Sequence, residues 1–411
     1  MNIAFFCYEY YPLLVGGLGT YAIEVTRKFK EFGNEVSVFT LNDGNLKTYE
    51  IWNGIEIHRP MLVDVMDIFP YVVKEDLRRW SWHLKFFADI YTYNILSSTK
   101  FVNLLIKKEK RKFDIISFHD WLSAFAGIIS KKNTNLPAVF HIHSVEEQRS
   151  LGSGSETIKE IEKLAAKHAD KIITVSYSMK DFLISLGYPK EKIEVVYNGI
   201  DTEKYSLKNV NWKLVEELRK RYKIENQTVI FFIGRLTWIK GVYNLIRAMS
   251  YVVKDFPNVK LIMLGKGESF NDLLQLRQQL GLEKYIEIRS EWVSEEERIA
   301  HYALADLCVF PSINEPFGIV SLEAMSMEKP VVVGAKNVNG LKEQVIPSGE
   351  NRCGVHVNGE DPQDIAWGIK VVLENLDEAK KWGKNGRKRV EENFKIEYTV
   401  KKTLEIYQSL L

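Results

Sequence analysis

The sequence predicts an α/β protein with two doubly wound domains, each built on a parallel sheet. Its length is one reason, because 411 residues exceed what a single hydrophobic core usually supports. Another is that apolar runs alternate with helical patterns along almost the whole chain, which is typical of buried parallel strands with helical crossovers. A polar stretch without clear periodicity, at about 200–212, separates two such series. We therefore expect an N-terminal and a C-terminal domain.

The first half of the chain supplies six apolar runs that we predict as buried strands. Helical patterns lie between several of them, for example at 19–33 and 121–132. Buried strands joined by helices should form one parallel sheet covered on both faces. In chain order the runs are 2–8, 35–41, 113–119, 137–143, 171–176 and 193–199.

The second half repeats this alternation and ends in an amphipathic helix at 397–411. Ligands of doubly wound sheets bind at the carboxyl ends of the strands, so residues that directly follow a strand are candidates for a site. The predicted strands are 227–234, 259–265, 285–289, 306–312, 329–334 and 353–357.

Composition limits the class of protein and of partner. The chain is 45% hydrophobic and 27% charged, as in globular rather than disordered proteins. A formal charge of +2 gives no reason to expect a nucleic acid as partner. Cys7 and Cys308 lie in apolar runs and are expected to be buried free thiols, which suits a reducing cytoplasm.

Neither a secretory signal nor a membrane span is expected. The first residues lack a basic region and soon turn polar. The aromatic stretch 79–106 is interrupted by charged residues, so it lacks the continuous apolar span of about 20 residues that a membrane helix needs. We expect a soluble, cytoplasmic protein.

A glycine-rich turn follows the first predicted strand. Gly16, Gly17 and Gly19 open a helix in "PLLVGGLGTY", where backbone amides can meet an anion. The dinucleotide fingerprint G-x-G-x-x-G is absent. A plain tight turn and a phosphate or sugar contact are equally compatible with these residues.

Histidines gather at two neighbouring strand ends of the first half. His119 and Asp120 follow one strand in "SFHDWL", at the ligand edge, although a structural histidine and a helix-capping aspartate are the simpler readings of either alone. His141 and His143 alternate along the next strand and should share a face. We do not favour a metal, because no third ligand has convincing spacing.

Two cations follow the first strand of the second half. Arg235 and Lys240 lie in "GRLTWIKGV", and the next strand ends in the glycine-rich "LGKGES" at 264–269. A phosphate group would explain cations at this edge, although two surface charges would also fit the pattern when taken alone.

Carboxylates and free amides follow a third strand in "FPSINEPFGIVSLEAM". Gly318, Ile319 and Val320 would present amides at a helix N-terminus. Glu315 precedes that helix, and Glu323 lies eight residues later, a little over two turns on. Together with the cations, this set suits a nucleoside diphosphate, whose phosphates need cations and amides and whose ribose needs an acid.

Five motifs of this chain occur in the order typical of one family: "VGGLGTY", "FHDW", "VVYNGID", "GRLTWIKGV" and "EPFGIVSLEAM". With them the sequence resembles retaining nucleotide-sugar glycosyltransferases of the GT-B fold, and most closely the archaeal glycogen synthase-like proteins. The resemblance implies two Rossmann-like domains facing across a cleft. Residues 1–205, completed by the C-terminal helix 396–411, would form the acceptor-side domain, and 206–395 the nucleotide-sugar-binding domain.

The resemblance also implies how a donor is bound. Arg235 and Lys240 would bind the diphosphate and neutralise the departing nucleotide. Glu323 would hold the ribose hydroxyls, and Glu315 the hydroxyls of the donor sugar. Backbone groups would complete the donor site at Gly16, Gly17, Gly318, Ile319 and Val320.

In the family, catalysis depends on charge rather than on a covalent intermediate. His119 would lie beneath the transferred sugar and help to stabilise positive charge at the anomeric carbon, so the expected catalytic set is His119, Arg235, Lys240 and Glu315. Acceptor-side candidates are Asp120, Trp121 and His143. Neither a metal nor a cofactor is expected, because the two cations replace the metal.

The resemblance implies transfer of glucose from an NDP-glucose to the non-reducing end of an α-1,4-glucan. One departure leaves the base open between UDP-glucose and ADP-glucose, because Leu14 stands where the bacterial and plant synthases carry lysine in Lys-x-Gly-Gly. The segment 289–297 does not decide the base. Trp292 could stack on it or belong to the core.

Two other functions remain open from the sequence. One is transfer of a hexose to a lipid-linked or small-molecule acceptor, since the aromatic stretch 79–106 and the basic run 107–112 together could favour an anionic membrane surface. We favour a long helical excursion that caps the first domain and has a solvated charged end over membrane association through 79–112. The other is a non-catalytic nucleotide-sugar binding protein.

Overall fold

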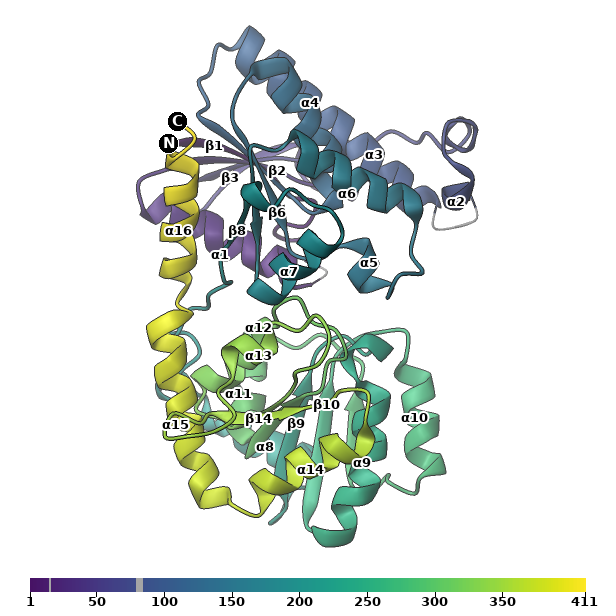
Figure 1. Ribbon diagram of the computed structural model, residues 1–411, viewed down its shortest axis with the longest axis vertical. Helices are drawn as coiled ribbons and strands as arrows, with labels where there is room; N and C mark the ends of the chain where they lie inside the picture. Colours follow the sequence, from purple (N-terminus) through teal and green to yellow (C-terminus); the bar gives the residue numbers. More distant parts are fainter. Residues whose placement is uncertain (15, 79–83) are drawn as a thin grey trace. The chain divides into compact units, whose positions relative to one another are not determined.

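A computed structural model describes residues 1–14, 16–78 and 84–411 (Figure 1). The chain divides into two compact units. Unit 1 comprises Met1–Val175, Lys180–Asn198 and Ile396–Leu411, and unit 2 comprises Ser176–Met179 and Gly199–Lys395. Each unit contains one sheet with its own core.

Unit 1 is built on an eight-stranded sheet in the order β3-β4-β2-β1-β5-β6-β7-β8. All neighbouring strands are parallel except β3 and β4. The six predicted strands are all present, at β1 (Asn2–Phe6), β2 (Glu35–Phe39), β5 (Ile115–His119), β6 (Ala138–Ile142), β7 (Lys171–Thr174) and β8 (Ile193–Val195).

A hairpin that the sequence analysis did not include extends this sheet at one edge. It joins β3 (Tyr49–Trp52) to β4 (Ile55–His58) through Asn53 and Gly54, whose φ angles of 51° and 74° are both left-handed. An Asn-Gly pair with two positive φ angles is the sequence signal of a two-residue hairpin turn. The signal is therefore present in the sequence.

Helices cover both faces of the unit 1 sheet, and the C-terminal helix is one of them. In Figure 1 the yellow α16 lies beside the purple α1, and both contribute side chains to one core with β1, β2 and β4. The helices are α1 (Gly17–Glu31), α2 (Glu75–Arg78), α3 (Leu84–Thr99), α4 (Ala124–Thr134), α5 (Glu146–Arg149), α6 (Glu156–His168) and α16 (Ile396–Gln408); α7 (Tyr177–Ser185) begins in unit 2 and ends in unit 1.

The aromatic stretch continues α3 into a π-helix at Lys100–Lys108, while its first five residues, 79–83, lie outside the described part of the chain. Tyr93 and Phe101 are fully buried, whereas Phe86 and Tyr91 are about two-fifths exposed. The large aromatic side chains next to the basic run 107–112 therefore face the core. One exposed aromatic does lie beside a lysine of this π-helix, because Lys100 Nζ stands 5.9 Å from the ring centre of Tyr49, which is 48% exposed.

Unit 2 is built on a six-stranded parallel sheet in the order β11-β10-β9-β12-β13-β14. All six predicted strands are present, at β9 (Thr228–Ile233), β10 (Val259–Leu264), β11 (Ile286–Arg289), β12 (Leu307–Phe310), β13 (Val331–Gly334) and β14 (Gly354–Val357). The helices are α8 (Trp212–Arg221), α9 (Val242–Asp255), α10 (Phe270–Gln279), α11 (Glu295–Leu304), α12 (Ile319–Ser326), α13 (Leu341–Gln344), α14 (Pro362–Leu373) and α15 (Leu376–Asn393).

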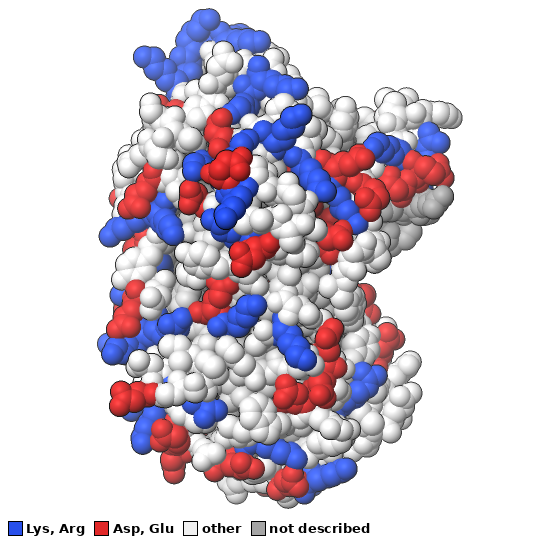
Figure 2. All heavy atoms as spheres, viewed as in Figure 1, with Lys and Arg blue, Asp and Glu red and all other residues white. Residues whose placement is uncertain are grey.

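The charged surface, the cysteines and the helices can each be compared with what the sequence predicted. Figure 2 shows Lys and Arg side chains interspersed with Asp and Glu over most of the visible face, with a group of Lys and Arg side chains at the top. Cys7, Cys308 and Cys353 are buried and free, as expected for the first two. Among the helices formed by residues 1–14, 16–78 and 84–411, none is both long enough and apolar enough to cross a membrane.

Candidate active site

Close backbone contacts hold two neighbouring strand ends of unit 2 together. A Cβ on Gly265 would lie 1.9 Å from the carbonyl oxygen of Gly234, and one on Gly267 would lie 2.2 Å from that of Leu236. Only glycine permits this approach. The glycines of "LGKGES" therefore bring the exits of β9 and β10 into contact at the carboxyl edge of the sheet.

The two predicted cations follow β9 at this edge. Arg235 is exposed, and Lys240 ends a short 3-10 helix at Trp238–Lys240. The next residue, Gly241, has a φ of 71°, and a Cβ there would lie 2.0 Å from the carbonyl oxygen of Pro311. This contact places the turn that carries Lys240 directly against the exit of β12.

Lys240 forms an ion pair with Glu315. Its Nζ donates to the carboxylate, and Ser312 Oγ donates to the same oxygen over 3.4 Å. The Glu315 side chain is 10% exposed and that of Lys240 is 20% exposed. The main chain of Glu315 is also fixed, because its amide donates to Val338 and its carbonyl accepts from Gly340. The structure thus brings together one predicted phosphate ligand and one predicted sugar ligand.

The second acid of the E-x7-E element is held by different partners. Tyr302 donates its hydroxyl to Glu323 over 2.8 Å, and Arg298 Nη1 lies 3.6 Å from the other carboxylate oxygen. Burial lowers the pKa of Arg298, but the charge of Glu323 and the neighbouring tyrosines outweigh it and leave that pKa raised. Glu323 is 3% exposed, so its carboxylate is fixed before any ligand binds.

Between the two acids, α12 begins at the predicted amides. Gly318 is the N-cap residue with a φ of 90°, and as a glycine it has no side chain that could cap the helix. A Cβ on Gly318 would lie 2.5 Å from Leu341 and 3.1 Å from the Glu315 side chain. The amides of Ile319 and Val320 have no acceptor within the helix, because the first turn of a helix leaves its N–H groups unpaired.

Unit 1 places its glycine turn against a carboxylate. Gly16 donates its amide to Glu9 Oε2 over 3.0 Å, and α1 begins at Gly17. A Cβ on Gly16 or Gly17 would meet nothing within 4 Å, so the surrounding protein does not require glycine for space. One amide expected to approach a phosphate is thus already bonded to an acid. Leu14, in the lysine position, is 38% exposed.

Three histidines at the ends of β5 and β6 form a cluster in unit 1. His119 and His141 are register partners and are 0% and 1% exposed, whereas His143 is half-buried. His119 Nδ1 lies 3.2 Å from His143 Nε2, and His119 Nε2 lies 3.0 Å from Ser117 Oγ. Both ring nitrogens of His119 are therefore engaged inside the protein. Of the three rings, only that of His143 presents surface to a ligand.

The rings lie nearly parallel. His119 stacks on His141 with centroids 4.3 Å apart and on His143 with centroids 5.5 Å apart, at interplanar angles of 27° and 20°. Imidazole lone pairs lie in the ring plane, so stacked rings do not direct them at one point as a metal requires. Burial lowers the pKa of all three, that of His143 to about 3. We describe the cluster as neutral and hydrogen-bonded.

Asp120 does not cap the following helix with its side chain. Its φ is 51°, and its carboxylate accepts hydrogen bonds from the amides of His143, at 2.7 Å, and Ser144, at 3.4 Å. Burial raises the pKa of Asp120 to about 6, while the Arg149 charge and these amides act in the opposite direction. The residue thus fixes the backbone that carries His143. Trp121, 6% exposed, stacks on Phe87.

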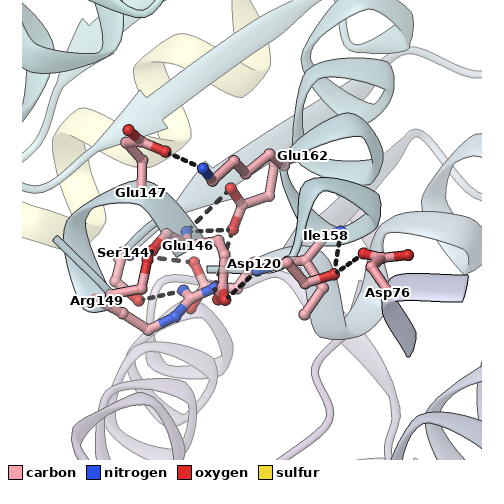
Figure 3. A network of polar contacts seen from close by, with 11 residues as sticks. Asp76, Asp120, Ser144, Glu146, Glu147, Arg149, Ile158 and Glu162 are labelled. Carbon is pink, nitrogen blue, oxygen red and sulfur yellow. Dashed lines mark hydrogen bonds and ion pairs between the residues drawn. The ribbon is translucent and has the colours of Figure 1, made fainter. Parts of the chain in front are cut away.

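A polar network surrounds this segment (Figure 3). Arg149 donates to Ser144, Glu146 and Glu162, and the Glu162 carboxylate also accepts the Glu146 amide at the start of α5. Burial raises the pKa of Glu162 to about 8, although Arg149 and the Glu146 amide oppose the shift. These contacts hold the chain after β6 against α6.

Two family models match the chain in succession. Residues 15–204 match Glycosyltransferase Family 4, and residues 215–389 match Glycosyl transferases group 1. The chain is 32% identical to the uncharacterized glycosyltransferase MJ1607 of Methanocaldococcus jannaschii, over 99% of this chain and 98% of that protein. The chain belongs to the group 1 glycosyl transferases. It is therefore an enzyme that transfers glycosyl groups.

This glycosyltransferase is also similar to proteins with named reactions. A glycogen synthase of Mycobacterium tuberculosis is 25% identical over 99% of this chain and 94% of its own length. Among solved structures, Anabaena Alr3699/HepE in complex with UDP and glucose gives a TM-score of 0.77 at 21% identity, with 100% of each chain covered. The catalytic domain of Arabidopsis thaliana starch synthase IV, bound to ADP and acarbose, gives 0.76 at 16%, covering 100% and 99%. These likenesses confirm the GT-B fold.

Sequence reasoning about the glycosyltransferase missed several residues of these sites. Arg298 and Tyr302 lie four residues apart on α11, the spacing that places two side chains on one helix face. No pattern near Arg298 or Tyr302 in the sequence connects α11 with Glu323.

Trp292 was left open between stacking on the base and a place in the core. It is 63% exposed, so it does not belong to the core.

Proposed function

We propose that this glycosyltransferase transfers glucose, with retention of configuration, from UDP-glucose or ADP-glucose to the non-reducing end of an α-1,4-glucan. The observation that carries the proposal is the pairing of Lys240 with Glu315 beside the start of α12, where the first backbone amides have no acceptor within the helix. Cation and amides suit a diphosphate, and the acids suit hydroxyl groups. The similar glycogen synthase and the solved structures named with UDP and glucose, or with ADP and acarbose, support the substrate class.

Cleavage of the sugar–phosphate bond creates an anionic diphosphate and a cationic sugar. Fixed positive charges at the phosphate stabilise that separation more than they stabilise the intact donor. Arg235 and Lys240 would supply these charges, so the proposal requires no metal. Glu323, already oriented by Tyr302, would accept the ribose hydroxyls.

Glu315 would bind sugar hydroxyls rather than attack the anomeric carbon. Its carboxylate is engaged by Lys240 and Ser312, and an ion-paired carboxylate is a weak nucleophile. Attack by the acceptor on the leaving-group face then accounts for retention. In unit 1 we assign the contact with the transferred sugar to His143 instead of His119, because His119 is 0% exposed.

Nucleotide release tests this function. Purified enzyme in EDTA is given UDP-glucose or ADP-glucose, with and without glycogen. We expect glycogen-dependent release from at least one donor, and transferred glucose that an exo-acting α-1,4-glucanase removes. Lys240→Ala should lower the rate of release about 100- to 1000-fold. Lys254→Ala removes an exposed lysine in the last turn of α9 and should leave the rate unchanged.

Two results would contradict the proposal. If UDP or ADP binds but glycogen elicits no release from either donor, the glucan acceptor is wrong, and lipid-linked and small acceptors become the next candidates. If release occurs only with an added divalent cation, the assignment of Arg235 and Lys240 fails.

A further inference from the structure

We propose that a buried chain of hydrogen bonds from the C-terminal helix fixes the tautomer of His143, so that His143 presents Nδ1–H to its ligand. Tyr407 and Ser117 are the positioning residues of this chain. The inference rests on the proposed function only for the identity of the ligand oxygen, which would be a hydroxyl of the transferred sugar.

The hydrogen-bond chain has four links, all within unit 1. His141 Nε2 lies 2.7 Å from the Tyr407 hydroxyl, which lies 2.7 Å from Ser117 Oγ. Ser117 Oγ lies 3.0 Å from His119 Nε2, and His119 Nδ1 lies 3.2 Å from His143 Nε2. Tyr407, Ser117 and His119 are 0% exposed, so water does not compete for these links.

Every side chain in this hydrogen-bond chain is neutral. Burial lowers the pKa of each imidazole, and burial raises the pKa of Tyr407. A neutral imidazole has one N–H donor and one nitrogen acceptor, and each hydroxyl has one proton to donate. A hydroxyl can also accept two hydrogen bonds, but Tyr407 or Ser117 would then strand its own proton, because neither has a further acceptor among the described residues. With both hydroxyl protons used inside the four links, only two arrangements remain, in which all protons point one way or all point the other way.

The far end of the chain selects between these two arrangements. His141 Nδ1 is buried and has no hydrogen-bond partner. If Tyr407 donated to His141 Nε2, the proton of His141 would sit on Nδ1 as a stranded N–H. Orphaned N–H groups are rarer in proteins than acceptors with an unused lone pair. His141 therefore donates to Tyr407, and its Nδ1 keeps only a lone pair.

The remaining protons follow from that choice. Tyr407 donates to Ser117, Ser117 donates to His119 Nε2, and His119 donates from Nδ1 to His143 Nε2. His143 Nε2 is then an acceptor, and its single proton lies on Nδ1. At the ligand edge this ring can donate a hydrogen bond to an oxygen but cannot accept a proton through Nδ1.

Two variants interrupt the chain without removing a ring. Tyr407→Phe keeps the aromatic packing against Phe29 and removes the hydroxyl, and Ser117→Ala breaks the chain one link later. In either variant His143 should populate both tautomers. The matched control is Tyr398→Phe on the same helix, where the tyrosine is 42% exposed.

Long-range ¹H–¹⁵N correlation spectra of histidine-labelled protein read the tautomer directly, with His143→Gln identifying the signal. We expect a single Nδ1–H form in the parent and the Tyr398→Phe control, and a mixture in the other two variants. Their kcat should fall about two- to tenfold, the value of one net hydrogen bond, with KM for the donor little changed.

An Nε2–H form of His143 in the parent protein would overturn the inference, as would an unchanged tautomer in both variants. The spectra need no substrate. A protein that shows the expected tautomers but transfers no glucose to glycogen would refute the proposed function and leave this inference standing. If both variants fail to fold, the parent spectrum decides alone.

Discussion

Removing the Lys240 charge separates two roles of this residue, one seen in the structure and one proposed. Lys240 pairs with Glu315, and we propose that it also contacts the donor diphosphate. An ion pair of this kind gains roughly 4 kcal/mol at about 4 Å with an effective dielectric constant of about 20. Because the two side chains are still 20% and 10% exposed, we expect Lys240→Ala to lower the free energy of unfolding by about 2 kcal/mol.

A double variant, Lys240→Ala with Glu315→Gln, is compared with the single variant Lys240→Ala. It leaves no unpaired buried carboxylate, so most of the lost stability should return. Nucleotide affinity should not return, because the cation itself is missing. We expect Lys240→Ala and the double variant to bind the product nucleotide equally weakly, at least tenfold below the parent, and kcat of Lys240→Ala to fall about 100- to 1000-fold.

Calorimetric titration with UDP or ADP measures the affinity, and urea unfolding measures the stability. Lys254→Ala is the control for loss of a lysine elsewhere in unit 2. If the double variant regained the affinity of the parent, Lys240 would serve only to neutralise Glu315. The phosphate role would then be refuted.

Three further variants test other contacts. Glu323→Gln should weaken nucleotide affinity about tenfold, because the ribose loses a charged acceptor. The effect on kcat should be smaller, because Tyr302 still holds the side chain. Unchanged affinity in a titration would contradict the ribose role. Gly241→Ala should lower the free energy of unfolding by more than about 2 kcal/mol, since its Cβ would lie 2.0 Å from a carbonyl oxygen. The control is Gly281→Ala, where the backbone is also left-handed but a Cβ would meet nothing within 4 Å. It should lower the free energy by about 1 kcal/mol in the same urea unfolding experiment. Burial raises the pKa of Glu162 from 4.5 to about 8, so the folded state keeps a proton that the unfolded state releases between these values. The free energy of unfolding should therefore fall as pH rises through that window, by at most about 1.4 kcal/mol per pH unit, and Glu162→Gln should flatten the slope; parallel pH profiles of the two proteins would contradict it.

The sequence was sufficient for the fold because each buried strand is marked by its own residues. Apolar runs such as 227–234 and 259–265 are local signals, and the strands lie where those runs predict. The hairpin at 49–58 was missed although its Asn-Gly turn and its alternating residues are visible, because each strand has only four residues and β3 contributes no buried residue.

The candidate site was predictable only where its residues are close in sequence. Glu315 and Glu323 share one motif, and Lys240 belongs to another. The partners that orient them come from other elements: Arg298 lies on α11, and nothing near Glu323 in the sequence points to it. Likewise, the alternation along the predicted strand 137–143 placed His141 and His143 on one face, but only the three-dimensional stacking shows that His119 is enclosed and His143 is accessible.

Carboxylates cap the starts of three helices in this protein, whereas the start of α12 at the candidate donor site has no such cap. Glu9 accepts the Gly16 amide before α1, Glu162 accepts the first amide of α5, and Glu343 accepts the first two amides of α7. Each of these carboxylates meets the partial positive charge of a helix start, so an external anion would have to displace it. At α12, by contrast, no side chain among the described residues caps the helix, and the amides of Ile319 and Val320 keep their donors unused. An anionic group that enters unit 2 would therefore meet unpaired amides at the start of α12, beside the Lys240–Glu315 pair, where we propose that the leaving diphosphate lies.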